Sequence, residues 1–310
     1  MNKQKLIRIT VLIFIITFVA MNVIAAFHAY KFTHLSKEKV VRTKNPDELT
    51  FLEKLNTLFF GINNPKPINE VKPSQDYETV FIEGNECWWL KQESSLGTIL
   101  IFHGYTGVKS QELEKAEYFI KMGYDVFLVD FLGSGGSEGY QTTIGFYEAD
   151  QVKACYEFIE NESELPVYLY GSSMGAVAIM KAIDKYQITP TSILIECPFG
   201  SMRETVKSRF KMMGVPSSPM GDLLLFWGGL MNNFWAYGHN PVEYAKSITV
   251  PTLLMYGRND QKVSLAETET IYDNLKGEKK LKIFEKSGHE TFLLEDKEEW
   301  VNTVSLFLRK

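Results

Sequence analysis

A serine between two glycines stands where a strand pattern turns directly into a helix pattern. The motif is Gly171-x-Ser173-x-Gly175, and it follows the apolar run Val167–Tyr170. Such a turn strains its central residue, and a side chain at either glycine would crowd it. It also exposes the serine hydroxyl at a helix N-terminus, where developing negative charge is favoured. Ser173 is therefore the candidate nucleophile.

A serine hydroxyl needs a base to activate it, and the base needs an acid to orient it. His289 comes soon after the apolar run Leu281–Phe284, and Asp260 follows the run Thr252–Tyr256 in the same way. Both residues would lie on loops at the sheet edge that carries Ser173. For either residue alone a surface turn is the simpler interpretation, but together the three predict a Ser-His-Asp triad.

Acyl transfer on such a triad also needs two backbone N–H donors for the oxyanion. One is expected from Met174, directly after the nucleophile. The other is expected from Tyr105, in the loop His103-Gly104-Tyr105 after the run Thr98–Phe102. We expect His103 itself to brace this loop and not to act in catalysis.

A second glycine-rich stretch begins at Asp130, after the apolar run 125–129. A dinucleotide fingerprint from Gly133 would need glycine where Glu138 stands, and no Gly-Lys-Ser or Gly-Lys-Thr follows. We therefore interpret this stretch as a turn near the site, without a nucleotide. Three scattered cysteines indicate neither a disulfide framework nor a metal site, so no cofactor is expected.

Short apolar runs alternate with helical patterns from residue 77 onwards. Segments 77–83 and 86–92, joined at Gly84-Asn85, predict an antiparallel hairpin. The later runs are almost continuously apolar, which is typical of parallel strands buried on both faces. They are 98–102, 125–129, 167–170, 192–195, 252–256 and 281–284. The predicted fold class is α/β, with a mostly parallel sheet and helices on both faces, including 111–122, 146–159, 174–186 and 265–275.

Residues 200–246 interrupt this alternation with about three helical stretches and no strand pattern. The segment is rich in methionine and aromatic residues. We predict a helical cap over the sheet edge, in which these side chains form the cap's own core, line an apolar substrate pocket, or do both.

The N-terminus carries an apolar run of nineteen uncharged residues, Ile9–Phe27, after Lys3, Lys5 and Arg8. At about 1.5 Å per residue this run matches the hydrocarbon core of a bilayer. A cleaved signal peptide is the alternative, although its apolar region is usually nearer ten residues. We expect residues 1–30 to form a short tail and a retained transmembrane anchor.

The basic residues on the two sides of this run predict opposite membrane orientations. Five basic residues follow it, and counting charge alone would place the C-terminal part inside the cell. A short basic tail before a first apolar segment is also how an exported protein begins. We expect a cytoplasmic tail and an extracytoplasmic catalytic part. The five residues are Lys31, Lys37, Lys39, Arg42 and Lys44.

Residues 31–76 are predicted to be a linker that contains one amphipathic helix. Asn45 would cap it, Pro46 would take its first position, Asp47 and Glu48 would lie in its first turn, and Gly61 would end it. Its leucines fall on one face. That face either packs on the main domain, which we favour, or lies in the membrane interface.

Together these motifs resemble the α/β-hydrolase superfamily, in particular its branch of serine aminopeptidases, monoacylglycerol lipases and lysophospholipase-like enzymes. The resemblance covers residues 77–310 and rests on HGYTG, D-x-x-G-x-G-G-S-x-G, GSSMG, GRND and GHE in this order. It implies Ser173 as nucleophile, His289 as base and Asp260 as acid. It also implies Tyr105 and Met174 as the donors of the oxyanion hole. Residues 77–310 would then be one hydrolase domain with its cap at about 200–246.

The expected function is a membrane-tethered serine hydrolase that cleaves a small acyl ester or lipid monoester through an acyl-enzyme. Ser172 and Ala176 stand where lipases of this branch commonly have histidine and glycine, so the resemblance does not single out a lipase. A serine peptidase, an amidase or an acyltransferase would use the same triad. A non-catalytic binding protein on the same fold is a further alternative. A net charge of −5 makes nucleic acid an unexpected partner, and no oligomeric state is indicated.

Overall fold

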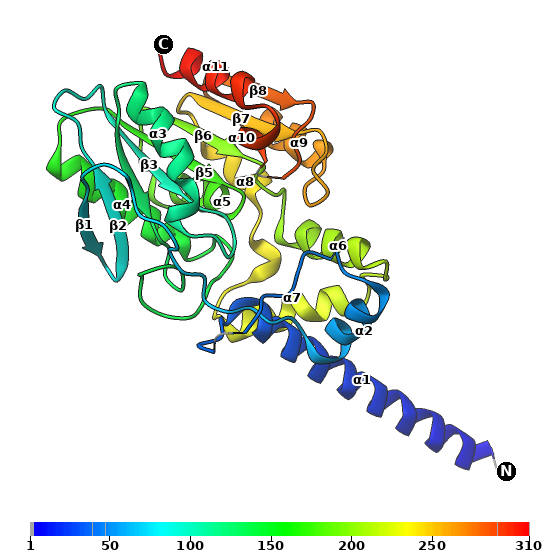
Figure 1. Cartoon of the computed structure of the whole chain (residues 1–310). Helices are drawn as coiled ribbons and strands as arrows, with labels where there is room; N and C mark the ends of the chain where they lie inside the picture. The colour runs from blue at the N-terminus through cyan, green and yellow to red at the C-terminus, as the bar shows by residue number, and fades with distance from the viewer. Residues whose placement is uncertain (1–2, 39, 47, 290, 310) are drawn as a thin grey trace.

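The computed structural model describes residues 3–38, 40–46, 48–289 and 291–309, and within them the chain forms a central eight-stranded sheet (Figure 1). The strands are β1 (Glu78–Ile82), β2 (Asn85–Leu90), β3 (Thr98–Phe102), β4 (Asp125–Val129), β5 (Val167–Ser172), β6 (Ser192–Glu196), β7 (Thr252–Gly257) and β8 (Lys279–Phe284). Their order is β1-β2-β4-β3-β5-β6-β7-β8. Only β2 pairs antiparallel with β1 and β4, which confirms the mostly parallel α/β class.

Helices cover both faces of this sheet and bury its strands. Alternate residues of β3 show the two layers, because Leu100 and Phe102 pack in one core and Ile99 and Ile101 in the other. The first core includes residues of α4 (Glu148–Glu162), α5 (Met174–Tyr186) and α9 (Leu265–Asn274). The second includes residues of α3 (Leu113–Lys121), which follows the short helix η1 (Lys109–Glu112), and of α10 (Phe292–Glu295) and α11 (Lys297–Leu308).

The predicted cap is present between β6 and β7. It consists of α6 (Met202–Met213), α7 (Met220–Met231) and the short helices η2 (Ala236–Gly238), α8 (Pro241–Tyr244) and η3 (Ala245–Ser247). It has a small core of its own in which Met202 and Leu225 are buried against Val177 of α5. The methionines and aromatic residues of this segment therefore hold the cap to the sheet domain.

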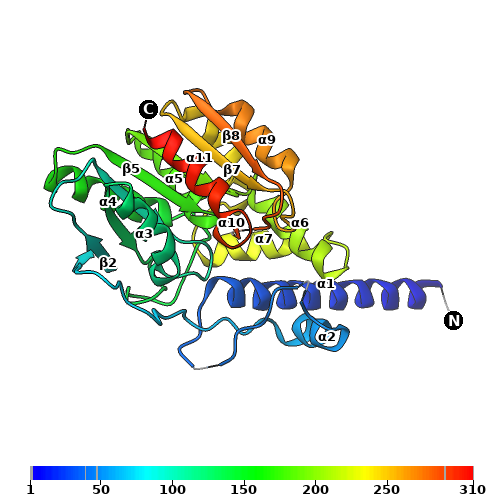
Figure 2. The same cartoon turned by 45° about the horizontal axis from the view of Figure 1, so that its top comes forward.

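The N-terminal helix α1 (Lys3–Thr33) projects from the domain, with α7 along one side and α2 (Phe51–Phe60) along the other (Figure 2). Among the described residues, α1 is the one helix long and apolar enough to cross a membrane. The Trp227 indole N–H donates to Asn22 Oδ1 at 3.1 Å, and so joins α7 to α1. The apolar run predicted from the sequence is thus a helix that contacts the cap.

Two local predictions differ from the structure. The hairpin turn is Glu83-Gly84, with φ values of 48° and 84°, and not Gly84-Asn85. A two-residue turn of type I′ has positive φ at both positions, as Glu83 and Gly84 do, and the buried Asn85 instead opens β2 opposite Ile82. The sequence did not indicate this register, because the first turn position is Glu83 and not a glycine.

The amphipathic helix α2 begins at Phe51 and not next to Pro46. Thr50 caps it, because its hydroxyl accepts from the Glu53 N–H while the Glu53 carboxylate accepts from the Thr50 N–H. This reciprocal capping box satisfies two backbone donors at once, which Asn45 cannot do here. Gly61 ends the helix as predicted. Asp47, assigned to the first turn from the sequence, lies outside the described residues.

The cap is joined to the domain by a histidine that is buried in its neutral form. His239 Nε2 donates to the Ile144 carbonyl at 3.0 Å, and its Nδ1 accepts from the Tyr244 hydroxyl at 3.0 Å. Burial lowers the pKa of His239 to about 4. Protonation would place a charge in this desolvated junction, which burial disfavours.

We expect His239 to make the folded state sensitive to acid. In the unfolded chain its pKa is about 6.5, so below that value the unfolded state binds a proton that the folded state excludes. Above pH 6.5 the titration of His239 does not lower the free energy of unfolding. As the pH falls from 6.5 to 4, this titration lowers the free energy of unfolding by about 3 kcal/mol. Urea unfolding of detergent-solubilised wild type and of His239→Gln at pH 7.5 and pH 4 measures this loss. Equal losses in both proteins would contradict the assignment.

Candidate active site

Ser173 lies in the tight turn between β5 and α5, with φ 51° and ψ −109°. Positive φ is uncommon for a residue other than glycine and indicates a strained backbone. A Cβ on Gly171 would lie 2.6 Å from Ala176 N, and one on Gly175 would lie 2.2 Å from the Phe102 carbonyl oxygen. The crowding that the sequence predicted at both glycines is therefore present.

The loops after β5, β7 and β8 bring Ser173, Asp260 and His289 together. His289 Nε2 lies 2.9 Å from Ser173 Oγ, and His289 Nδ1 lies 2.7 Å from Asp260 Oδ2. The Asp260 side chain is fully buried and that of His289 is 7% exposed. Backbone N–H groups of Lys262 and Val263 donate to Asp260 Oδ1 at 2.7 and 3.0 Å. Ser173 Oγ, the two ring nitrogens of His289 and Asp260 Oδ2 thus form one continuous series of hydrogen-bond contacts.

The surroundings of Asp260 favour its ionised form. Burial alone would raise the pKa of Asp260, but the hydrogen bond and charge of His289 and the two backbone donors outweigh burial and hold the pKa below its usual range. An ionised carboxylate stabilises a proton on the facing Nδ1 of His289. The opposite nitrogen, Nε2, is then free to accept the proton of the Ser173 hydroxyl.

The two expected oxyanion donors face the same space as the serine. Tyr105, Met174, Ser173 and His289 all line one cavity. Among the described residues, no protein acceptor is hydrogen-bonded to the backbone N–H of Tyr105 or of Met174. Both donors are therefore available to a substrate oxygen.

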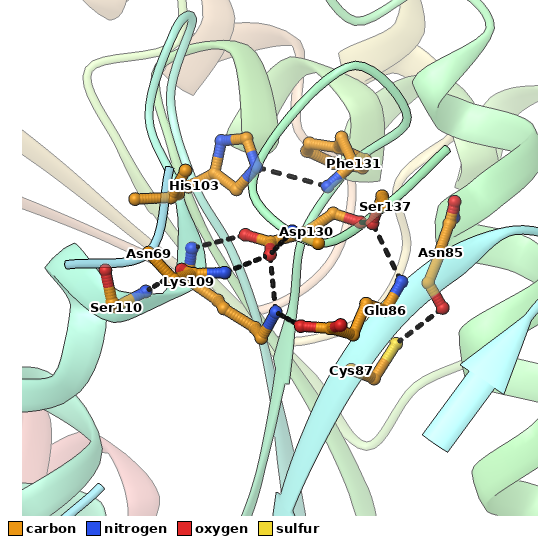
Figure 3. A network of polar contacts seen from close by, with 12 residues as sticks. Asn69, Asn85, Glu86, Cys87, His103, Lys109, Ser110, Asp130, Phe131 and Ser137 are labelled. Carbon is orange, nitrogen blue, oxygen red and sulfur yellow. Dashed lines mark hydrogen bonds and ion pairs between the residues drawn. The ribbon is translucent and has the colours of Figure 1, made fainter. Parts of the chain in front are cut away.

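His103 anchors the start of the loop that carries Tyr105. Its Nε2 accepts from the Phe131 N–H at 3.1 Å, and its Nδ1 donates to the Gly104 carbonyl at 2.7 Å (Figure 3). The ring is fully buried and stacks edge-on against Phe131. These contacts match the bracing role expected for it.

Asp130 and Lys109 hold the other end of this loop in a buried network (Figure 3). The Lys109 N–H donates to Asp130 Oδ1 at 2.7 Å, and the Lys109 ammonium contacts Asp130 Oδ2 and, at 2.7 Å, Glu86. Asn69 also donates to Asp130, at 2.6 Å. Burial alone would raise the pKa of Asp130, but Lys109 and His103 outweigh burial and lower it.

Sequence reasoning noted Asp130 only as the start of a glycine-rich turn, and it missed Lys109 and Glu86. The available signal was a carboxylate directly after the apolar residues 126–129 of the buried strand β4. Such a group must find a buried partner, because an isolated charge there is costly.

The segment predicted as a linker also supports the loop after β3. The Tyr105 hydroxyl donates to the Phe32 carbonyl in the last turn of α1 at 2.6 Å, and Asn64 donates to the same hydroxyl at 2.9 Å. The Arg42 guanidinium donates to the Thr106 carbonyl at 2.8 Å. Phe32, Arg42 and Asn64 of this segment thus belong to the scaffold of the site, so the described part of the segment does not act only as a tether.

A second buried ion pair lies behind the nucleophile. Lys115 Nζ contacts Ser172 Oγ at 3.0 Å and Glu196 Oε2 at 2.9 Å, and the Trp300 indole donates to Glu196 Oε1 at 2.7 Å. Burial alone would lower the pKa of Lys115, but Glu112 and Glu196 outweigh burial and raise it well above its usual value. The small hydroxyl of Ser172 fits this pair, which gives a physical reason for serine at that position.

One group of possible metal ligands within the described residues overlaps the site. Ligand atoms of Cys197, Asp260 and His289 lie within 4.8 Å of one another. The Asp260 and His289 atoms are already hydrogen-bonded to each other and to Ser173, and burial raises the pKa of the Cys197 thiol well above its usual value. A protonated thiol is a poor ligand, so this donor set suits proton transfer better than metal binding.

The cavity at Ser173 is apolar and has a volume of about 340 Å³. Its walls come from the cap, from α2 and from α1, and they confirm that methionine and aromatic residues of the cap line a pocket. The cap residues of this kind are Met202, Phe210, Met213, Met220 and Phe234. A second, more polar cavity of about 610 Å³ adjoins it across Tyr105 and Thr106, and Arg42, Lys44 and Lys262 line both.

The chain matches the family described as Serine aminopeptidase, S33, over residues 93–227 and 229–297. The uncharacterized protein YqkD of Bacillus subtilis is 27% identical over 215 residues, which cover 68% of this chain and 70% of that protein. Lysophosphatidylserine lipase ABHD12 of Xenopus tropicalis is 30% identical over 135 residues, or 41% of this chain and 34% of that protein. The mouse protein of the same name is 28% identical over 62% of this chain and 49% of its own length. The chain thus spans between a third and a half of these lipases.

Solved structures show the same fold. The esterase Pf2001 of Pyrococcus furiosus superposes with a TM-score of 0.66 at 24% identity, covering 79% of this chain and 96% of that one. An esterase from Exiguobacterium antarcticum gives a TM-score of 0.56 at 19% identity, with 75% and 99% covered. The protein belongs to the serine aminopeptidase S33 family of α/β-hydrolases. It is a hydrolase of this family and is similar to proteins named as esterases and lipases.

We expect Lys109→Met to destabilise the protein strongly, by about 3–5 kcal/mol, because it leaves the Asp130 carboxylate buried without its cation. Urea unfolding measures this loss. Lys153→Met, which breaks the exposed pair with Glu157 on α4, is the matched control and should change stability little. A comparable loss in both variants would show that the buried network does not hold the loop.

Proposed function

We propose that the protein is a membrane-anchored serine hydrolase that cleaves carboxylic esters carrying one acyl chain, through an acyl-enzyme. The observation that carries this proposal is the hydrogen-bonded chain Ser173, His289 and Asp260 at the end of an apolar cavity. Hydroxyl, imidazole and carboxylate in this order are what nucleophilic acyl transfer requires.

In the proposed reaction Ser173 Oγ attacks the ester carbonyl while His289 Nε2 takes its proton. Asp260 keeps the imidazole oriented and stabilises its charged form. The N–H groups of Tyr105 and Met174 stabilise the oxyanion. His289 then donates the proton to the departing alcohol, and a water activated by the same nitrogen releases the acid and restores the serine.

The two adjoining cavities favour an amphiphilic ester over a peptide. The apolar cavity suits an acyl chain, and the polar one, lined by Arg42, Lys44 and Lys262 and also by Glu48, Glu112 and Glu114, suits a polar alcohol part that carries groups of both charges. A lysophospholipid combines both, and the ABHD12 relatives are named for such a lipid. Peptide hydrolysis would use the same triad, but an apolar cavity with few polar groups offers little for a peptide backbone.

We also propose that α1 is a retained anchor that places the hydrolase domain outside the cytoplasm. Its length, its apolar surface and its contacts with the cap support a permanent segment. In intact cells, a cysteine introduced at the exposed Glu93 should react with an impermeant maleimide, and one introduced at Gln4 should not. The reverse labelling would contradict this orientation.

Ser173→Ala should lower hydrolysis of nitrophenyl butyrate by at least about a thousandfold, because the nucleophile is lost. Ser172→Ala is the control on the neighbouring serine. Its hydroxyl faces Glu196 and Lys115 and not the cavity, so its loss should cost less than about tenfold. If Ser173→Ala keeps wild-type activity, Ser173 is not the nucleophile. If the wild type hydrolyses no ester and reacts with no fluorophosphonate, a binding protein on this fold replaces the enzyme.

A further inference from the structure

The C-terminal third of α1 forms part of the wall of the active-site cavity. Ile24, His28 and Ala29 line the same cavity as Ser173 and His289. A helix that served only as a tether would not need to reach the reacting groups. The position of α1 therefore bears on how a substrate reaches Ser173.

Packing of the cap against α1 closes one side of the cavity. Trp227 of α7 donates to Asn22, and Gly228 faces Ala29, where an added Cβ would lie in ordinary contact at 3.9 Å from the alanine Cβ. Small residues at such a crossing let two helices approach closely. Gly228 and Leu224 of α7 line the cavity beside α1.

Helix α2 closes the opposite side of the cavity. His28 Nε2 donates to the Leu58 carbonyl at 3.0 Å, which joins α1 to α2. Thr57 and Leu58 line the cavity, while Lys54 donates to the Met212 carbonyl of α6 at 3.2 Å. The cavity is thus framed by α1, α2 and the cap helices, and Ser173 lies in its wall.

This frame lies at the level where α1 would leave a membrane. Ile24 falls within the uncharged run 9–27, and Thr33, at the end of the helix, is only about 14 Å further along the axis. Phe59 on α2, and Phe226 and Trp235 on the cap, are 43–75% exposed near the same frame. Exposed aromatic residues next to a membrane helix are typical of the membrane–water interface.

We propose that the cavity opens sideways into the bilayer between α1, α2 and α7, and that a membrane-resident monoester enters there with its acyl chain lying against α1. Ile24 stands at the opening and limits the chain that can pass. The volume of about 340 Å³ is near the small end of ligand sites, which favours one acyl chain. This inference rests on the proposed serine hydrolase function and adds the route and a residue that selects chain length.

The test uses the full chain in phosphatidylcholine vesicles, with hexadecyl and ethyl fluorophosphonate as covalent probes of Ser173. Ile24→Trp places an indole in the opening. Val23→Trp, on the adjacent position, is the matched control, since Val23 is 62% exposed and does not line the cavity. Each buried methylene is worth about a fourfold change in binding, so excluding a few should be readily measured.

We expect Ile24→Trp to lower the hexadecyl labelling rate by more than about tenfold and the ethyl rate by less than about twofold. Val23→Trp should leave both rates within about twofold of wild type. An unchanged ratio of the two rates in Ile24→Trp, or an equal fall in Val23→Trp, would overturn entry along α1. If Ile24→Trp reacts with neither probe, the smaller substitution Ile24→Phe takes its place. Ile24→Phe must then lower the hexadecyl rate more than the ethyl rate, by a smaller factor than that expected for Ile24→Trp.

Failure of the underlying function gives a different result. A wild-type protein that neither probe labels, or labelling that persists in Ser173→Ala, would refute the proposed nucleophile and the inference with it. Ethyl labelling that depends on Ser173 but a hexadecyl rate that ignores Ile24 refutes only the route.

Discussion

The close approach of α5 to the end of β3 constrains the whole edge of the sheet that carries the site. Gly175 lies so near the Phe102 carbonyl that no side chain fits between them. This contact brings the turn at Ser173 against the loop of Tyr105, so backbone geometry sets the distance between the proposed nucleophile and the proposed oxyanion donors. The Ser173 N–H donates to the Glu196 carbonyl at 2.8 Å and helps to hold a strain of about 1–3 kcal/mol.

Two buried ammonium groups, those of Lys109 and Lys115, support this edge. They fix the positions of its loops and strand ends more than they add to its stability. A buried ion pair contributes little net stability compared with apolar residues of the same size, yet a charge left alone is costly. Each pair therefore permits only arrangements in which both partners meet. Lys109 and Asp130 fix the loop after β3, and Lys115 and Glu196 fix the ends of β5 and β6 beneath the nucleophile.

The parts of the structure that the sequence predicted well are those that local patterns determine. The bounds of β3, β4 and α5 agree with the apolar periodicity, because strands and helices of this kind must bury one face or both. Parallel strands present their following loops at one edge, so Ser173, Asp260 and His289 could be placed together without a structure. Contacts such as that of Arg42 with Thr106 join segments 64 residues apart through backbone carbonyls, which leave no sequence signature. Glu83 and Thr50 show that turn and cap positions also depend on competition between neighbouring residues.

If α1 is retained in the membrane as proposed, the hydrogen bond from the Tyr105 hydroxyl to the Phe32 carbonyl ties the proposed catalysis to that anchor. A protease that cut between α1 and β1 would then remove one wall of the cavity and a support of the loop that carries Tyr105. Shedding would therefore act as inactivation and would not spread the activity into the surroundings. Under the proposed function, hydrolysis would then stay confined to the membrane that holds α1.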